Sequence, residues 1–443
     1  MEISPFQGIR YNQGIVGGLA QVLCPPYDVV APEQRKLCHE KSDYNAIRLE
    51  SSAESPEPTD DSYQKAAITF QQWLKKGVLQ LDRTPSFYLH DHHFEYSGEK
   101  RVRRGLIARI KLQPWGSGIY PHEETSSKAK SDRLQLMRAC RASFSPLLSL
   151  YHGSEPKVAL KLSEVAQGEP IIRTSVPPPS TGEGQGGEGH VVWAITDPET
   201  RLQLSQFLSS QPIYIADGHH RYETALAYQR ERAQHQSAPF VSSVIASEAK
   251  QSVAGKEAFN YVMMELVDFS DPGLVVLPLH RLVRGVAPSV LAGLEEQLRN
   301  FFVLESVPVK ADSYQLSDDS CLGVLGLLPG SLAVLKKRQD VSLQALMPGS
   351  RSQAYREFSL SILNHIILDN ILGFTSKEDV AYTVDLKEAY QQMKEGKYQL
   401  AFLANPPQPE VVKAVADAQD KMPGKSTYFY PKLPAGLIIN PLD

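Results

Sequence analysis

The segment Asp217-Gly218-His219-His220-Arg221 places a carboxylate, two imidazoles and a guanidinium within five residues. Four strand-forming residues, 213–216, lead into it, and a helix-forming run follows directly. The start of a helix leaves backbone N–H groups unpaired and carries the positive end of the helix dipole. A strand, a turn and a helix in this order therefore predict an anion site, most simply one for phosphate.

The side chains of this turn suit the same chemistry. Gly218 would let an anion come close to the backbone, and Arg221 offers a forked donor that matches phosphate oxygens. His219 and His220 can donate hydrogen bonds to the same group, and Asp217 could hold a Mg²⁺ ion that bridges the oxygens. The simpler alternative is that Asp217 only caps the helix and that the histidines are satisfied polar residues.

A second group of reactive residues follows Tyr120 and Pro121. A carboxylate beside an imidazole and a set of cations has the ingredients of a general base next to a bound phosphate. The residues are His122, Glu123 and Glu124, followed by Lys128, Lys130 and Arg133. The alternative is an exposed loop that leads into a helix with ordinary acidic residues near its start.

Three further histidines resemble metal ligands at first sight. His90 and His92 would share one face of a strand, and His93 would face the other way. No third ligand is evident from the sequence, whereas zinc sites need at least three protein ligands. We therefore expect polar surface here and no zinc site.

Hydrophobic periodicity and turn residues predict a mixture of helices and strands. Helices are expected at Pro32–Lys41, around Ala66–Leu74 and at Tyr355–Leu372, the last with Phe358, Ile362, Leu363, Ile366 and Ile367 inward. Strands are expected at Asn45–Leu49, Asn260–Val267 and Val275–Leu279, and a hairpin joins Phe87–Tyr96 to Gly105–Lys111. The predicted fold class is α/β with a mixed sheet.

The predicted organisation has four parts. An N-terminal α/β region covers residues 1–175, and a Gly- and Pro-rich loop covers 176–190. Residues 191–285 hold the Asp217 segment and an Ala- and Ser-rich loop insertion at 242–256, and residues 286–443 form a C-terminal α/β region.

Composition limits the classes of function. The 443 residues are 42% hydrophobic and 22% charged, as in a folded protein, and the net charge of −4 disfavours nucleic acid as a partner. The four cysteines are far apart, which fits reduced thiols. The N-terminus does not read as a secretory signal, and the longest apolar stretch, 321–335, is shorter than the roughly 20 residues that span a bilayer. We expect a cytoplasmic protein without a membrane span. Its oligomeric state is left open.

Several longer motifs resemble the signatures of domain-of-unknown-function family 1015 over nearly the whole chain. They are Cys24–Val29, Asn45–Leu49, Pro121–Thr125, Asp132–Leu134, Ala216–Ala225, Asn260–Met264 and Lys425–Lys432. The Gly-rich loop and the 242–256 insertion are departures that touch none of these motifs.

The His-Glu segment followed by Asp-Gly-His-His-Arg also resembles the ParB/sulfiredoxin-like free-serine kinases. This resemblance implies a ParB/sulfiredoxin-like core with additional N- and C-terminal α/β elements, ATP or ADP as phosphoryl donor, Mg²⁺, and free L-serine as acceptor. It makes Glu123 the general base, with Glu124 as the alternate and His122 beside it. Asp217 becomes the metal-linked residue and Gly218–Arg221 the phosphate cradle, with Lys130 and Arg133 as further cations.

Two relatives within that superfamily fit less well. Sulfiredoxin has a cysteine where this chain has His219, so reduction of sulfinic acids through a thiol is disfavoured. ParB proteins act on DNA, and this chain has neither a basic domain nor a clear helix-turn-helix. The resulting hypothesis is a nucleotide-dependent kinase of a small hydroxyl metabolite. A regulatory protein that binds nucleotide without transfer, and a phosphohydrolase at the same site, are the alternatives.

Overall fold

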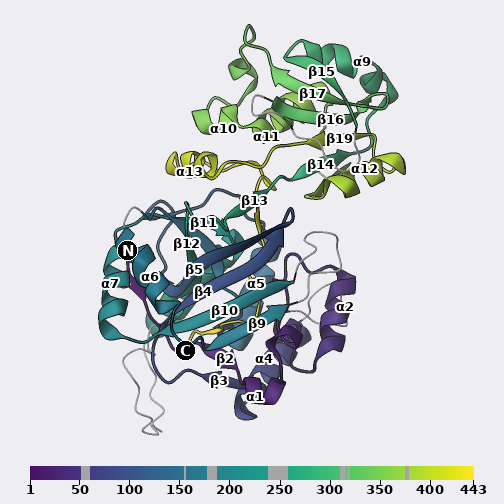
Figure 1. Cartoon of the computed structure of the whole chain (residues 1–443). Coiled ribbons are helices and arrows are strands. Elements are labelled where there is room, and N and C mark those ends of the chain that lie inside the picture. The colour runs from purple at the N-terminus through teal and green to yellow at the C-terminus, as the bar shows by residue number, and fades with distance from the viewer. Residues whose placement is uncertain are drawn as a thin grey trace. The chain divides into compact units, whose positions relative to one another are not determined.

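The computed structural model describes residues 1–50, 60–153, 156–176, 187–237, 258–309, 316, 320–374 and 379–443 (Figure 1). These residues divide into two compact units, which are described here one by one. Unit 1 comprises Met1–Tyr120, Thr125–Leu274 and Pro431–Asp443, and unit 2 comprises Pro121–Glu124 and Val275–Tyr430.

Unit 1 is built on a mixed sheet, in which the described residues form nine strands. Eight of them run in the order β6-β11-β8-β12-β5-β4-β10-β9, and β1 pairs with β5. The pairs β6–β11 and β8–β12 are parallel and the others are antiparallel. Their bounds are β1 Ile3–Ser4, β4 Phe87–Tyr96, β5 Glu99–Lys111, β6 Ile119–Tyr120, β8 Leu147–Tyr151, β9 Ile172–Val176, β10 Glu188–Ile195, β11 Ile213–Asp217 and β12 Tyr261–Asp268. The predicted mixed α/β class is confirmed.

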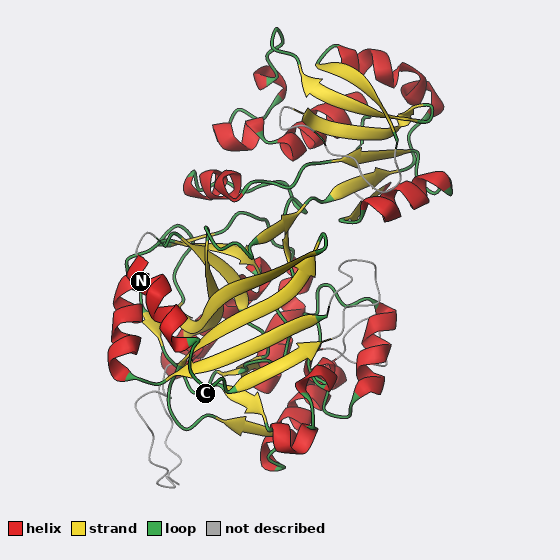
Figure 2. Cartoon of the chain, viewed as in Figure 1, coloured by secondary structure: helices red, strands yellow, loops and turns green. Residues whose placement is uncertain are grey.

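Helices cover both faces of this sheet, shown in red beside the yellow strands in Figure 2. Phe87 and Leu89 share a core with α6 and α7, whereas Tyr88, which points the other way, shares one with α3, α4 and α5. The helices are α1 Gln13–Val16, α2 Pro32–Lys41, α3 Ile47–Glu50, α4 Asp60–Lys75, α5 Ser127–Cys140, α6 Pro156–Val165, α7 Pro198–Ser209 and α8 His219–Ser237, with short 3₁₀ turns η1 Leu19–Gln21 and η2 Ala258–Asn260. Two small ribbons pair β2 Ile9–Tyr11 with β3 Leu79–Leu81 and β7 Ala142–Ser143 with β21 Asn440–Pro441.

Several predicted elements of unit 1 are confirmed. The hairpin of β4 and β5 turns at Ser97 and Gly98, which both have positive φ (54° and 80°), as a tight two-residue hairpin turn requires. The α2 helix has the predicted bounds, and α4 buries Ala66, Phe70 and Trp73 at helical spacing.

The strand predicted at Asn45–Leu49 is wrong. The Asn45 side-chain oxygen accepts a hydrogen bond from the backbone N–H of Ile47 (3.0 Å), and its amide donates to the carbonyl of Gln21 (2.8 Å). These side-chain bonds to the backbone start the short α3 helix instead of a ladder. Ile47 and Leu49, two residues apart, are both buried because α3 is surrounded by other parts of the chain. Their alternate spacing resembles that of a strand with one buried face, although the segment is helical.

Unit 2 has an antiparallel sheet, and the part of it that is described contains six strands in the order β15-β17-β16-β19-β14-β18. They are β14 His280–Val283, β15 Phe302–Pro308, β16 Ser320–Leu328, β17 Ser331–Lys337, β18 Val380–Thr383 and β19 Leu400–Leu403, and a separate ribbon pairs β13 Val275–Leu277 with β20 Tyr428–Tyr430. The helices are α9 Pro288–Arg299, α10 Gln353–Glu357, α11 Ser359–Ile362, α12 Leu386–Lys394 and α13 Pro409–Asp417, with the 3₁₀ turn η3 Gln344–Leu346 and the π-helix η4 Leu363–Ile371.

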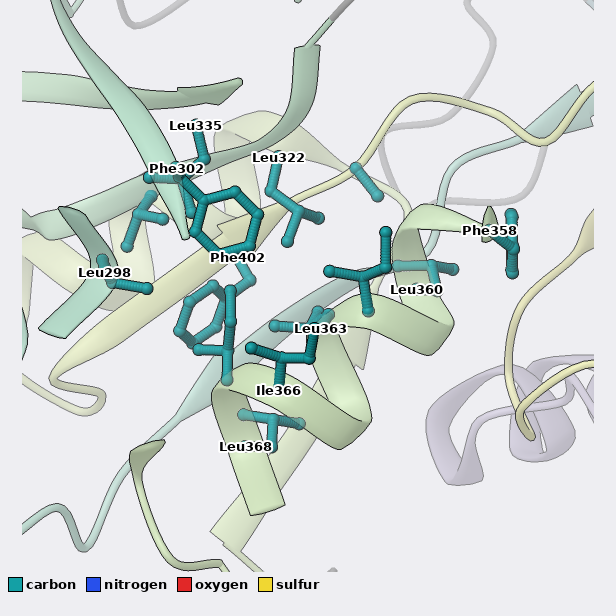
Figure 3. Close-up of a cluster of buried hydrophobic side chains, with 14 of the residues drawn as sticks. Leu298, Phe302, Leu322, Leu335, Phe358, Leu360, Leu363, Ile366, Leu368 and Phe402 are labelled. Carbon is teal, nitrogen blue, oxygen red and sulfur yellow. The ribbon is translucent and has the colours of Figure 1, made fainter. Parts of the chain in front are cut away.

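The single helix predicted at Tyr355–Leu372 is three segments. Phe358 has extended backbone (φ −70°, ψ 130°), which ends α10 and begins α11, and α11 passes directly into the π-helix η4. The five residues predicted to face inward are all buried. Figure 3 shows this segment packing against Leu298, Phe302 and Phe402 of the sheet and α9. The apolar pattern thus identified the core face and missed the break.

Two predicted loops fall on residues that are not described. Most of the 176–190 loop, residues 177–186, and all of the 242–256 insertion lie outside the described ranges. Among the described helices, none is both long and apolar enough to cross a lipid bilayer.

Candidate functional site

The turn that follows β11 has the predicted strand, turn and helix. β11 is buried up to Ala216, Asp217 ends it, and α8 begins at His219. Gly218 has φ +99°, which is costly for residues with a Cβ atom. A Cβ atom here would also lie 2.8 Å from Leu147 Cγ and 3.0 Å from Arg221 Nη2. Glycine is therefore required by backbone shape and by close packing.

Asp217 lies between two cations of unit 1. Its Oδ2 accepts a hydrogen bond from Arg221 Nη2 at 2.8 Å, and its Oδ1 accepts one from Lys432 Nζ. Burial alone would raise the pKa of Asp217, but Lys432 and Arg221 outweigh it, and the pKa lies well below its usual range. Asp217 is therefore a permanently charged carboxylate with a cation on each oxygen.

Arg221 is held from its other side as well. Its Nη1 donates to Ser145 Oγ and to the carbonyl of Pro146, both at 2.9 Å, in the connection between β7 and β8. The side chain is buried, and the carboxylates of Asp217 and Asp28 outweigh that burial and raise its pKa. Its guanidinium fixes the turn to the sheet and holds Asp217 in place.

His220 joins the starts of two helices. Its Nε2 accepts a hydrogen bond from the backbone N–H of Ser126 (2.8 Å), so this nitrogen carries no proton. Ser126 is the N-cap of α5, and its own hydroxyl accepts from the N–H of Ala129. The positive ends of the α5 and α8 dipoles therefore lie close together in unit 1. His219, the neighbouring residue, is buried.

The other two predicted cations of unit 1 form separate ion pairs. Lys130 pairs with Glu223 at 2.7 Å, and Glu223 also accepts from Thr125 Oγ1. Arg133 pairs with Glu50 at 2.7 Å and lies 4.0 Å from the centre of the Tyr27 ring. Both side chains are thus engaged by carboxylates.

Tyr27 and Glu50 of this site were not given a role from the sequence, and for the segment Lys425–Lys432, which contains Lys432, the sequence left open whether it lines the site or is a strand that docks onto the core. Burial raises the pKa of Glu50, and the charges of Arg133 and Arg221 oppose that shift. Because Arg221 also pairs with Asp217, the Glu50–Arg133 pair and the Asp217–Arg221 pair influence each other electrostatically. Each of the three belongs to or directly follows a motif that carries the family resemblance. The sequence signal for these three residues was their place in or next to a motif far from the Asp217 segment. Their contacts with that segment become visible only in the folded chain.

A small cavity of about 40 Å³ lies beside this group in unit 1. Its lining includes the charged residues Arg133, Glu50 and Arg221 and the apolar residues Phe144 and Leu147. Its volume suits a few water-sized groups and is far below the several hundred Å³ of a typical ligand pocket.

His122, Glu123 and Glu124 belong to unit 2. The buried His122 contacts Thr427 Oγ1 through Nε2 at 2.9 Å, and its carbonyl accepts from the N–H of Met422. Glu123 Oε1 accepts from the backbone N–H of Lys425 at 3.0 Å, whereas Glu124 is exposed. The segment around Lys425 thus orients Glu123. The proposed pairing of Glu123 with Asp217 joins residues of two units, and it stays a prediction.

The expectation of polar surface at His90 and His92 is wrong. Both side chains are buried, and the buried His190 of β10 lies against them, whereas His93 is exposed as expected. His190 pairs with His92 across the antiparallel ladder. The third imidazole was missed because it is far away in sequence and reaches the first two only through strand register.

Comparisons with solved structures give distant similarities. A free serine kinase mutant in complex with ADP aligns at 12% identity over 74% of this chain and 88% of its own, with a TM-score of 0.34. A conserved hypothetical protein from Pyrococcus furiosus aligns at 13% identity over 74% of this chain and 96% of its own, with a TM-score of 0.33. C-terminally truncated SbnI from Staphylococcus aureus aligns at 8% identity over 74% and 84%, with a TM-score of 0.33.

Sequence comparison is more specific about the family. No curated protein matches the chain at a significant level. The family model described as "Protein of unknown function (DUF1015)" matches residues 3–362, which is most of the chain. The chain therefore belongs to the DUF1015 family.

Proposed function

We propose that this protein is a nucleotide-dependent phosphotransferase that acts on a small hydroxyl metabolite, free L-serine, with ATP or ADP as donor. The observation that carries the proposal is the meeting of two helix starts, linked from Ser126 to His220, next to the Lys432–Asp217–Arg221 group. Helix N-termini and cations are what bind and stabilise transferring phosphoryl groups.

The roles of the residues follow from their contacts. Lys432 Nζ holds Asp217 in the structure, and it would turn to the phosphate when a metal ion takes its place on that carboxylate. Arg221 is a positioning residue, because its guanidinium is engaged by Asp217, Ser145 and Pro146. The N–H groups that open α8 and α5 would bind phosphate oxygens.

Asp217 has the oxygen ligands that Mg²⁺ prefers. Both oxygens lie against cations, so a metal ion on this residue would replace Lys432 at Oδ1. When bound, Mg²⁺ would neutralise phosphate charge at the donor.

Glu123 is the proposed general base. It would accept the proton of the serine hydroxyl while that oxygen forms a bond to the terminal phosphorus and the bond to the leaving ADP or AMP breaks. The hydrogen bond from the Lys425 N–H orients the carboxylate for this transfer.

The direct test incubates the full chain with Mg²⁺, serine and either ATP or ADP, and follows O-phosphoserine by phosphorus NMR. Glu123→Gln should lower kcat about 10²- to 10⁴-fold while nucleotide affinity is kept. Glu124→Gln, the exposed neighbour, is the matched control, and a larger loss in that variant would move the base to Glu124.

The other outcomes separate the alternatives. Nucleotide binding without product would favour a regulatory nucleotide-binding protein, and phosphate release without serine would favour a phosphohydrolase. Failure to bind either nucleotide would refute the proposal.

A further inference from the structure

Four adjacent strands of unit 1, β12, β5, β4 and β10, carry polar side chains on one face of the sheet. Strands β10, β4 and β5 lie side by side (Figure 1). Across the ladders, His190 of β10 pairs with His92 of β4, and His92 pairs with Arg103 of β5. His90 lies two residues from His92, on the same face. We call His90, His92 and His190 the histidine cluster.

The three imidazoles are close enough to share one ion. One ring nitrogen of each lies within 4.8 Å of those of the other two, and His90 Nε2 is 3.1 Å from His190 Nδ1. All three side chains are buried. Burial holds the pKa of His92 and of His190 well below its usual range, so both rings are neutral and keep a lone pair for a metal.

Carboxylates fix the proton positions on two of the rings. Glu265 Oε2 lies 2.8 Å from His90 Nδ1, and since a carboxylate only accepts, this nitrogen carries the proton. The lone pair of His90 is then on Nε2, where it accepts a hydrogen bond from His190 Nδ1, and a bound ion would take the place of this hydrogen.

His92 follows the same logic with its nitrogens exchanged. Arg103 Nη2 lies 3.2 Å from His92 Nδ1, and since a guanidinium only donates, the lone pair is on Nδ1. His92 Nε2 therefore carries the proton and donates to Glu188 Oε2 at 3.0 Å. An outer carboxylate on one nitrogen and a lone pair on the other is the usual arrangement of a metal-bound histidine.

A second observation points to a cation. Glu265 is fully buried, and among the described residues its Oε1 accepts no hydrogen bond. A buried carboxylate oxygen without a partner is costly, and a nearby positive charge offsets that cost. Burial lowers the pKa of Arg103 and the charge of Glu265 opposes that shift, but Arg103 donates its hydrogen bond to His92 and not to this oxygen.

We propose that His90, His92 and His190 form a binding site for one divalent transition metal ion of the zinc type, with Glu265 and Glu188 as the outer carboxylates. Three imidazoles suit zinc, cobalt, nickel and copper ions better than Mg²⁺ or Ca²⁺. Arg103 withdraws from His92 Nδ1 when the ion binds. The ion then links β4 to β10 through its ligands. This proposal does not depend on the phosphotransferase proposal.

The test uses Co²⁺ as a spectroscopic probe on the full chain after chelator treatment. We expect saturable binding of one ion, visible absorption bands of a nitrogen-ligated Co²⁺ ion, displacement by Zn²⁺, and a higher melting temperature with Zn²⁺. His190→Ala should lose the binding and the thermal shift. His93→Ala, an exposed histidine on the same strand, is the matched control and should keep both.

A milder variant distinguishes loss of the metal site from misfolding of the chain. Glu265→Gln keeps all three imidazoles and should weaken Co²⁺ binding about 10- to 100-fold, as loss of an outer partner does. The proposal is overturned if the unaltered chain binds no Co²⁺, or if His190→Ala binds it as tightly as His93→Ala. It is equally overturned if Glu265→Gln leaves the affinity unchanged.

Discussion

Two places on the nine-stranded sheet of unit 1 bury carboxylates: the Asp217 turn and the surroundings of the histidine cluster. They differ in the groups that lie against the carboxylate and offset its negative charge. In the turn, Asp217 lies between Lys432 and Arg221, and its pKa is lowered. In the histidine cluster, Glu188 faces a neutral imidazole, and burial raises its pKa to about 7, although Arg103 opposes the shift. The first group is charged throughout the physiological pH range. The second changes its charge with pH, or with a bound cation.

The largest effect is expected from breaking the first group. Asp217→Ala leaves Lys432 and Arg221, whose side chains are only 13% and 10% exposed, without their carboxylate. Unpairing buried charges costs about 3 to 5 kcal/mol of unfolding free energy, which urea denaturation would measure. Glu40→Ala, in the exposed pair with Lys36, is the control and should cost less than about 1 kcal/mol.

A double variant shows whether the unpaired positive charge of Lys432 causes the loss of stability in Asp217→Ala. Asp217→Ala with Lys432→Met should lose less than the sum of the two single variants, because the second change removes one of the stranded cations. Additive losses would mean that Lys432 and Asp217 do not act as a pair.

The histidine cluster should differ in its response to pH. The pKa of Glu188 is raised from 4.5 to about 7 in the folded state, so its proton stabilises the fold below pH 4.5, and this stabilisation is lost as pH rises to 7. His92 and His190 have lowered pKa values and act in the opposite direction, and Arg103 keeps its charge. The informative quantity is therefore the stability of the unaltered chain minus that of Glu188→Gln.

That difference should fall by about 3 kcal/mol between pH 4.5 and 7, since the histidines contribute equally to both proteins. Urea denaturation at half-unit pH steps would measure it. A difference that does not change with pH would show that Glu188 titrates normally.

Both regions crowd a glycine, but only Gly218 of the turn has a positive φ. A Cβ atom on Gly105 would lie 2.4 Å from Glu265 Cγ, although Gly105 has no positive φ. Gly105→Ala should therefore cost about 1 to 3 kcal/mol through overpacking, as measured by thermal denaturation. Gly189→Ala, on β10, meets neighbours at 3.4 Å or more and should be close to neutral. Adding Glu265→Asp, which shortens the side chain, should recover part of the loss.

The same contrast explains what could be predicted from the sequence. The Asp217 turn is one continuous segment, so its strand, glycine and helix were visible as neighbours. The histidine cluster depends on register across β4, β5 and β10, and nothing in the spacing of His90 and His92 marks His190 as their partner. The motif that contains Lys432 was visible in the sequence, but its contact with Asp217 was not, since Lys432 lies in the last stretch of the chain. Local capping by Asn45 and the break at Phe358 also overrode patterns that predicted a strand and a continuous helix.

Among the predicted site residues, the smallest effect on stability is expected at Lys130, and this makes it useful for testing nucleotide binding. Its pair with Glu223 is 35% exposed on the lysine side, so Lys130→Met should cost less than about 1 kcal/mol. If Lys130 contacts the phosphates of a bound nucleotide, the same variant should weaken nucleotide affinity by about 1.5 to 3 kcal/mol, measured by titration calorimetry. A fall in affinity without a fall in stability would then report a lost ligand contact. Equal affinity in the variant would confine the role of Lys130 to its pair with Glu223, and would leave Lys432 and the two helix starts as the phosphate-binding groups.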